Sequence, residues 1–139
     1  MLIELEFDTG ARGGALLGDI ASSLVSVDEL LRDLASLAAD PSSVEFRNVE
    51  IVAIEMRSPL KIRLSLFGIS PDAVTAFQDI CRAIIVTRER GSRLATPAAS
   101  LSDELRARMT EQEGERLQGH VVTLQNAAIP LKHVLVKED

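Results

Sequence analysis

The sequence predicts a single α+β domain spanning residues 1–139. Residues 3–7 alternate between apolar and acidic side chains, which is the pattern of a half-buried strand. Two further apolar strands meet at a short link over residues 57–59 and lie between two helical segments. The length suits one domain with a sizeable core. The first ninety residues therefore read as strand, helix, strand, strand and helix.

The first strand is followed by a helix expected over residues 14–38. Its apolar positions recur at alternating spacings of three and four, which is a heptad pattern. A capping-box pair, Ser26 and Glu29, could divide this helix near Val25. We call the following six residues the heptad stripe: Leu17, Ile20, Leu24, Val27, Leu31 and Leu34.

The next two strands are expected around residues 49–56 and 60–66. The first is apolar on both faces, which indicates a strand covered on both sides, whereas the second alternates cleanly. Ser70, Pro71 and Asp72 then combine an N-cap, a proline at the first helical position and an acid in the first turn. This pattern predicts a second helix, for which Gly91 suits the C-terminal cap.

The remainder of the chain is harder to assign. Residues 91–100 have the composition of a loop, and a third helix is expected over 101–118. Residues 121–124 and 131–136 then read as a C-terminal hairpin. The alternative extends the third helix to Ala128 and leaves only the last strand.

This order is that of a ferredoxin-like, split βαβ sandwich. It comprises a βαββα core over residues 1–90, a loop over 91–100, and a helix with a strand or hairpin over 101–139. We therefore expect an antiparallel or mixed sheet with helices on one face, together with an extra C-terminal helix and hairpin. In that topology the first strand lies beside the third, so acids of the first strand, Glu4 and Glu6, would face bases of the third, Lys61 and Arg63.

Composition excludes some classes of partner. The net charge of −6 argues against a protein whose main partner is a polyanion. The chain has no Trp and no Tyr, so it has few rings on which bases could stack. We therefore do not expect direct nucleic-acid binding.

The sequence favours a cytoplasmic protein. Residues 1–4 lack an export signal, no apolar run approaches the ~18–20 residues of a membrane span, and Cys81 is a single thiol. We expect no membrane association. Arg far outnumbers Lys, and Ala and Leu are abundant. We interpret this amino-acid composition as that of a protein from a GC-rich bacterial gene.

No catalytic motif is present. The sequence contains neither a nucleophile elbow nor a phosphate-binding glycine loop of the usual spacing. His120, His133 and Cys81 are too few and too far apart in the sequence to predict a zinc site. We therefore expect no enzyme, no metal and no cofactor.

Two functions remain as hypotheses. The heptad stripe is longer than a small sheet needs, which favours a homo-oligomer, or a complex with another protein, formed through the 14–38 helix. The alternative is a regulatory domain that senses a small anionic metabolite. Its binding residues would be Arg12, Arg82, Arg88, Arg90 and Arg93, most of which lie at or beyond the end of the second helix.

Overall fold

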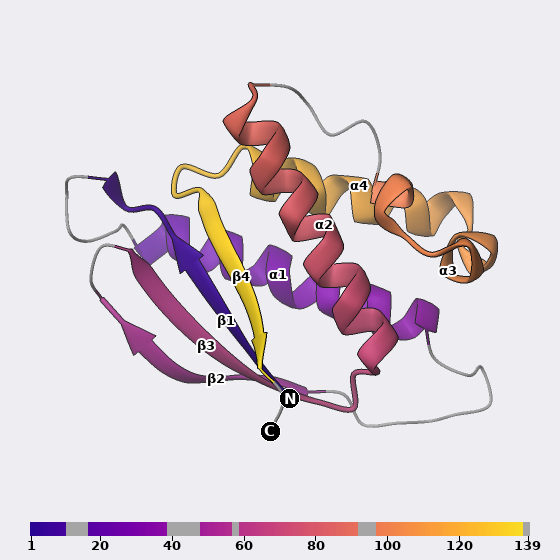
Figure 1. The fold of residues 1–139 in the computed structure, drawn as a ribbon, viewed down its shortest axis with the longest axis horizontal. Coiled ribbons are helices and arrows are strands. Elements are labelled where there is room, and N and C mark those ends of the chain that lie inside the picture. The colour runs from indigo at the N-terminus through magenta and orange to yellow at the C-terminus, as the bar shows by residue number, and fades with distance from the viewer. Residues whose placement is uncertain (11–16, 39–47, 57–58, 92–96, 138–139) are drawn as a thin grey trace.

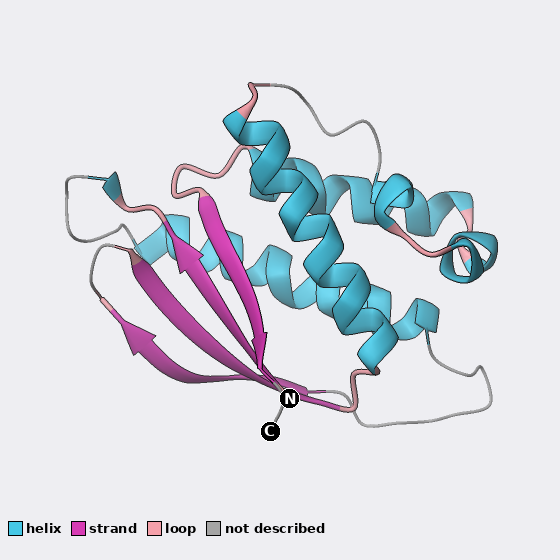
Figure 2. Cartoon of the chain, in the orientation of Figure 1, coloured by secondary structure: helices cyan, strands magenta, loops and turns pink. Residues whose placement is uncertain are grey.

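The computed structural model describes residues 1–10, 17–38, 48–56, 59–91 and 97–137. Within these ranges the chain is mixed α+β, as predicted (Figures 1 and 2). The strands are β1 (Leu2–Phe7), β2 (Asn48–Glu55), β3 (Leu60–Phe67) and β4 (Leu131–Lys137). The helices are α1 (Leu17–Ala38), α2 (Pro71–Glu89), the 3₁₀ helix η2 (Pro97–Ser100), α3 (Asp103–Arg108) and α4 (Glu111–Gln125).

The four described strands form one sheet in the order β2-β3-β1-β4, and each neighbouring pair is antiparallel. β2 and β4 are the edges. Figure 1 shows α1 passing behind the sheet and α2 lying beside β4. The expected neighbourhood of the first and third strands is confirmed, because Glu4 lies opposite Arg63 and Glu6 lies opposite Lys61.

One face of the sheet carries the core. Alternate side chains of β1 and β3, such as Ile3, Leu5 and Ile62, have no solvent exposure. Successive residues of a strand point to opposite faces, so the acids and bases between them lie on the other face. Phe77 and Ile80 of α2 join the same buried cluster.

The ends of α2 follow the sequence closely. The hydroxyl of Ser70 accepts a hydrogen bond from the backbone N–H of Ala73 at 3.3 Å, and Pro71 is the first helical residue. Beyond the last turn, Gly91 adopts φ +68°, a left-handed conformation that costs glycine little. Both caps were predicted from the residue types alone.

α1 is one continuous helix of 22 residues, so the Ser26–Glu29 pair, which could have divided it near Val25, does not do so. The capping-box pair lies in its interior, where burial of the neighbouring apolar side chains favours continuing the helix. Neither α1 nor another helix in the described ranges is long and apolar enough to cross a bilayer.

The C-terminal hairpin predicted from the sequence is wrong, and the alternative is correct in making this region helical, although the helix ends at Gln125 and not at Ala128. Residues 121–125 belong to α4, whose buried residues Leu117, Val121 and Leu124 are spaced by four and three. The helix expected over 101–118 is also two helices, because Thr110 starts α4 with a capping box. Its hydroxyl accepts from the Glu113 N–H at 3.1 Å, and its own N–H donates to the Glu113 carboxylate at 3.3 Å. Part of the loop expected over 91–100 is η2, and residues 92–96 lie outside the described ranges.

Candidate interaction surface

Most residues of the heptad stripe are buried or partly buried in the protomer's own core. Val27, Leu31 and Leu34 are at most 1% exposed. Leu24 is partly buried against the same core, as is Ile20, and Leu17 remains 82% exposed. The helices α2 and α4 both pack against α1. The stripe thus offers a partner little more than its N-terminal end, and an interface at these six residues stays a prediction.

A different apolar surface is open to solvent, on β2. We call it the β2 edge and define it by four side chains that are each 50–54% exposed: Ile51, Val52 and Ile54 of β2, and Met56, which directly follows the strand. By contrast, Leu60, Ile62, Leu64 and Leu66 on the neighbouring β3 are all buried. The sequence predicted that this strand would be covered on both faces, and that prediction is wrong.

The position of β2 explains its exposure. In the described sheet β2 pairs with β3 alone, so its other side presents backbone N–H and C=O groups to solvent. Residues 48–55 contain Glu50 and Glu55 but no Lys, Arg or Pro, the residues that commonly block pairing at an edge. The β2 edge is therefore apolar and lacks Lys, Arg and Pro, and its two Glu residues are its charged side chains.

A bulge interrupts β2 at its centre. Ile51 lies opposite Leu64 and Ala53 lies opposite Arg63, so Val52 is an extra residue in the ladder. The bulge changes which side chains share a face. Val49, Ile51 and Ile54 point to the helix-covered side of the sheet, opposite buried residues of β3. Asn48, Glu50, Ala53 and Glu55 point to the open side.

The other edge differs in both chemistry and cover. β4 exposes Lys132, His133 and Lys137, and its one large apolar side chain with substantial exposure is Leu135, at 39%. α2 lies close along β4, and Leu131 and Val134 are buried (Figure 1). Basic side chains and a covering helix are the means by which sheet edges avoid pairing. Of the two edges of the described sheet, β2 is the one that no described helix covers.

The open side of the sheet is held by ion pairs around Glu4. Its carboxylate lies 3.1 Å from Arg63 Nη2 and 3.3 Å from Lys137 Nζ, so it ties β1 to both neighbouring strands. Glu6 and Lys61 form a longer pair at 3.7 Å. The hydrogen bond from Arg63 lowers the pKa of Glu4, assisted by Lys137 and opposed by burial. This cluster stabilises the sheet.

The arginines expected to bind an anion do not form one site in the described chain. Arg88 donates to the backbone oxygens of Gln125 and Ala127 at 2.6 and 3.3 Å, and so caps the C-terminus of α4. Arg82 and Arg90 are exposed on and just after α2. The predicted residues Arg12 and Arg93 lie outside the described ranges. Anion binding by this set remains a prediction.

The two histidines and the cysteine, His120, His133 and Cys81, lie in separate parts of the fold. His120 contacts Asp33 and Glu29 of α1, whereas His133 lies opposite Glu6 on the open side of the sheet. Cys81 is fully buried, and burial raises the pKa of its thiol. In the described ranges no group of three or more His, Cys, Asp or Glu residues is arranged to hold a metal ion.

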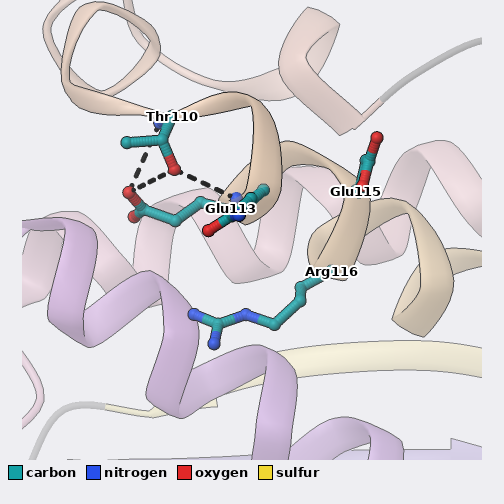
Figure 3. Close-up of a pocket in the computed structure, with 5 residues that line it drawn as sticks. Thr110, Glu113, Glu115 and Arg116 are labelled. Carbon is teal, nitrogen blue, oxygen red and sulfur yellow. Dashed lines mark hydrogen bonds between the residues drawn. The ribbon is translucent and has the colours of Figure 1, made fainter.

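A shallow depression lies at the start of α4 (Figure 3). Thr110 and Glu113 are engaged in the capping box, and the Arg116 side chain extends toward α1, where it lies 3.5 Å from Asp33. Thr110, Glu113 and Arg116 in this depression thus make contacts within the fold. A second groove, between α2 and α3, is lined by Asp72, Asp79 and Glu104 with Arg108, whose guanidinium pairs with Glu104 at 2.9 Å.

Comparison with known proteins gives no family. No family model, no curated protein and no solved structure matches this chain.

The β2 edge was not predicted from the sequence, because an edge strand and a fully covered strand can share an apolar pattern on both faces. The absence of basic residues and proline from residues 48–55 was the available signal.

Proposed function

We propose that this protein is a non-enzymatic interaction subunit that binds a protein partner by adding a strand at the β2 edge. The observation that carries this proposal is the row of half-exposed aliphatic side chains on an edge strand without a basic residue or proline. Strand addition uses the free backbone groups for affinity and the neighbouring side chains for specificity.

The energetics favour coverage of the β2 edge. Full burial of an Ile, Val or Met side chain is worth about 1.5–3 kcal/mol, so the exposed halves of Ile51, Val52, Ile54 and Met56 represent about 1 kcal/mol each. Scattered apolar residues need no explanation, but three of these four lie close together in β2 and Met56 directly follows the strand. The proposal therefore moves the contact surface from α1, as expected from the sequence, to β2.

The same proposal includes a ferredoxin-like sheet. It is supported by the strand order β2-β3-β1-β4 with antiparallel neighbours, in which β3 separates β1 from β2 as a split βαβ unit requires. A sheet of this kind has two edges and one open face, so strand addition at β2 would extend it without disturbing the core.

A site-specific crosslink tests the proposed function. A photoreactive amino acid replaces Val52 in one variant and Leu135, on the β4 edge, in a matched control, and both are expressed in the cells that naturally make the protein. We expect Val52 to give a discrete protein adduct, identified by mass spectrometry, which Leu135 does not give. Equal or no crosslinking at the two positions would overturn the proposal.

A further inference from the structure

We infer that the partner strand at the β2 edge belongs to another protein and alternates aliphatic side chains with Lys or Arg, so that its basic side chains lie beside the acids of β2. The inference rests on the proposed function and gives the chemistry of the partner. The observation behind it is the arrangement of charges on the open side of the sheet.

Acidic and basic strands alternate across the open side of the sheet. Opposite charges on neighbouring strands stabilise a sheet, and like charges directly opposite destabilise it. In the order β2-β3-β1-β4 the ionisable side chains on this side are acidic, basic, acidic and basic: Glu50 and Glu55, then Lys61 and Arg63, then Glu4 and Glu6, then His133 and Lys137. The next strand in this series, beyond β2, would be basic.

The acids of β2 are available to such a strand. Both are exposed. Glu50 accepts a hydrogen bond from the uncharged amide of Asn48 at 2.7 Å. Lys61 lies opposite Glu55, but its ammonium group is 3.7 Å from the carboxylate of Glu6 on β1. Among the described residues no ion pair engages either acid of β2, so their charges remain to attract a basic partner.

The bulge at Val52 places both acids on one side. Glu50 and Glu55 are separated by an odd number of residues along the chain, which would put them on opposite faces of a regular strand. The extra residue brings both to the open side, opposite Ser65 and Lys61 of β3. One face of an incoming strand therefore meets both acids, while its other face covers the exposed aliphatic side chains.

The bulge and the acids also restrict which strand can bind. A bulge interrupts the ladder, and charges on an edge discourage pairing with an arbitrary strand. An uncharged strand gains nothing beside the two acids, and an acidic strand is repelled. A strand with bases on the open side and aliphatic side chains on the other gains ion pairs with Glu50 and Glu55 while it covers Ile51 and Ile54.

A second copy of this chain is a poorer partner. Its β2 would bring the same two acids and no base. Its β4 is basic on the open side, but α2 packs against β4, and pairing of β2 with β4 would continue head-to-tail into a filament. The charge of β2 therefore favours a different protein with a basic, aliphatic segment.

Binding of short peptides tests the inferred chemistry. The probes are fluorescein-labelled peptides of about ten residues that alternate valine with lysine, with glutamate or with serine. In fluorescence anisotropy we expect the lysine peptide to bind, and the other two to bind about tenfold more weakly or less. A fourth peptide, with its valines and lysines in two blocks, keeps the charge but loses the alternation and should also bind about tenfold more weakly. Equal affinity for the lysine and serine peptides, or for the alternating and block peptides, would overturn the inference.

Paired variants locate the site of peptide binding. Glu50→Gln with Glu55→Gln removes two acids from β2, and Glu111→Gln with Glu115→Gln removes two exposed acids from α4. Both double variants change the net charge by the same amount, so any general attraction changes alike. We expect the β2 variant to bind the lysine peptide about tenfold more weakly and the α4 variant to bind it nearly as the native protein does. Equal losses would overturn the inference, and far-ultraviolet circular dichroism checks that both variants fold.

The crosslink at Val52 in cells separates this inference from the proposed function. The segment joined to Val52 should alternate aliphatic residues with Lys or Arg. A segment of another protein without bases, or a strand of a second copy, would overturn the inference and leave strand addition at β2 standing. Failure of Val52 to crosslink to any protein would remove both.

Discussion

His120 of α4 lies with its Nε2 atom 3.0 Å from an Asp33 carboxylate oxygen on α1. Glu29 approaches the other ring nitrogen at 3.4 Å, and Arg116 approaches the Asp33 carboxylate at 3.5 Å. The contact joins two helices that are distant in the sequence. It also fixes α4 against α1, the helix that carries the heptad stripe.

Replacing Asp33 should loosen this junction. Asp33 is 24% exposed and serves two partners, so we expect Asp33→Ala to lower the free energy of unfolding by about 1 kcal/mol. The matched control is Asp28→Ala, which breaks a more exposed pair with Arg32 on the same helix and should cost less. Urea denaturation measures both, and equal effects would show that the α1–α4 contact adds nothing.

The Glu4 cluster should make the stability of the protein depend on pH on the acid side. The pKa of Glu4 lies below its ordinary value of 4.5, chiefly because Arg63 donates to its carboxylate. A carboxyl group whose pKa is lowered by folding stabilises the protein above its unfolded pKa, and this contribution is lost as the pH falls through the folded pKa.

We therefore expect Glu4→Gln to be less stable than the native protein by about 1–2 kcal/mol at pH 7. The difference should shrink as the pH is lowered below 4.5, which chemical denaturation at a series of pH values would measure. Glu6→Gln is the control, because its 3.7 Å pair with Lys61 is longer. A Glu4→Gln deficit that is constant across pH would contradict the assignment.

Arg88 is predicted to act as a structural cap. Its guanidinium donates to two carbonyl oxygens at the end of α4, so Arg88→Ala should cost about 1 kcal/mol of stability. Arg82→Ala, which removes an exposed arginine from the same helix, should be nearly neutral. If Arg88→Ala proved neutral and inorganic phosphate stabilised the native protein but not the variant, the anion-binding role would be favoured instead.

Gly119 tests the helical assignment of the C-terminal region. It lies inside α4, and a Cβ added there would meet no atom within 4 Å. Gly119→Ala should therefore stabilise the protein by about 1 kcal/mol, whereas Gly91→Ala, at φ +68°, should destabilise it by a similar amount. Thermal unfolding of the two variants gives opposite shifts if α4 is a helix, and a destabilised Gly119→Ala would contradict it.

The local sequence was sufficient to predict those elements whose structure is decided by interactions between neighbouring residues. The alternation in β1 and β3 and the caps of α2 are each visible in a few consecutive residues. The pairing of Glu4 with Arg63 could also be predicted from the sequence, because the order of elements limits which strands can be neighbours.

The remaining differences depend on long-range packing. Val121, Val122 and Thr123 are β-branched and favour a strand locally, but the burial of Val121 and its helical neighbours against α1 outweighs that preference. The heptad stripe has the pattern of a contact surface whether its partner is another chain or a helix of the same chain. Likewise, the pattern of β2 does not reveal that it lies at an edge.

The central position of β1 has a consequence for synthesis on the ribosome. β1 is made first, yet one of its two flanking strands, β4, is made more than a hundred residues later. A nascent chain that has not yet produced residues 131–137 would leave one side of β1 unpaired, in addition to the exposed strand at the opposite end. Such long-range pairing slows folding, and unpaired strands promote aggregation, so we expect the nascent protein to depend on chaperones until β4 emerges.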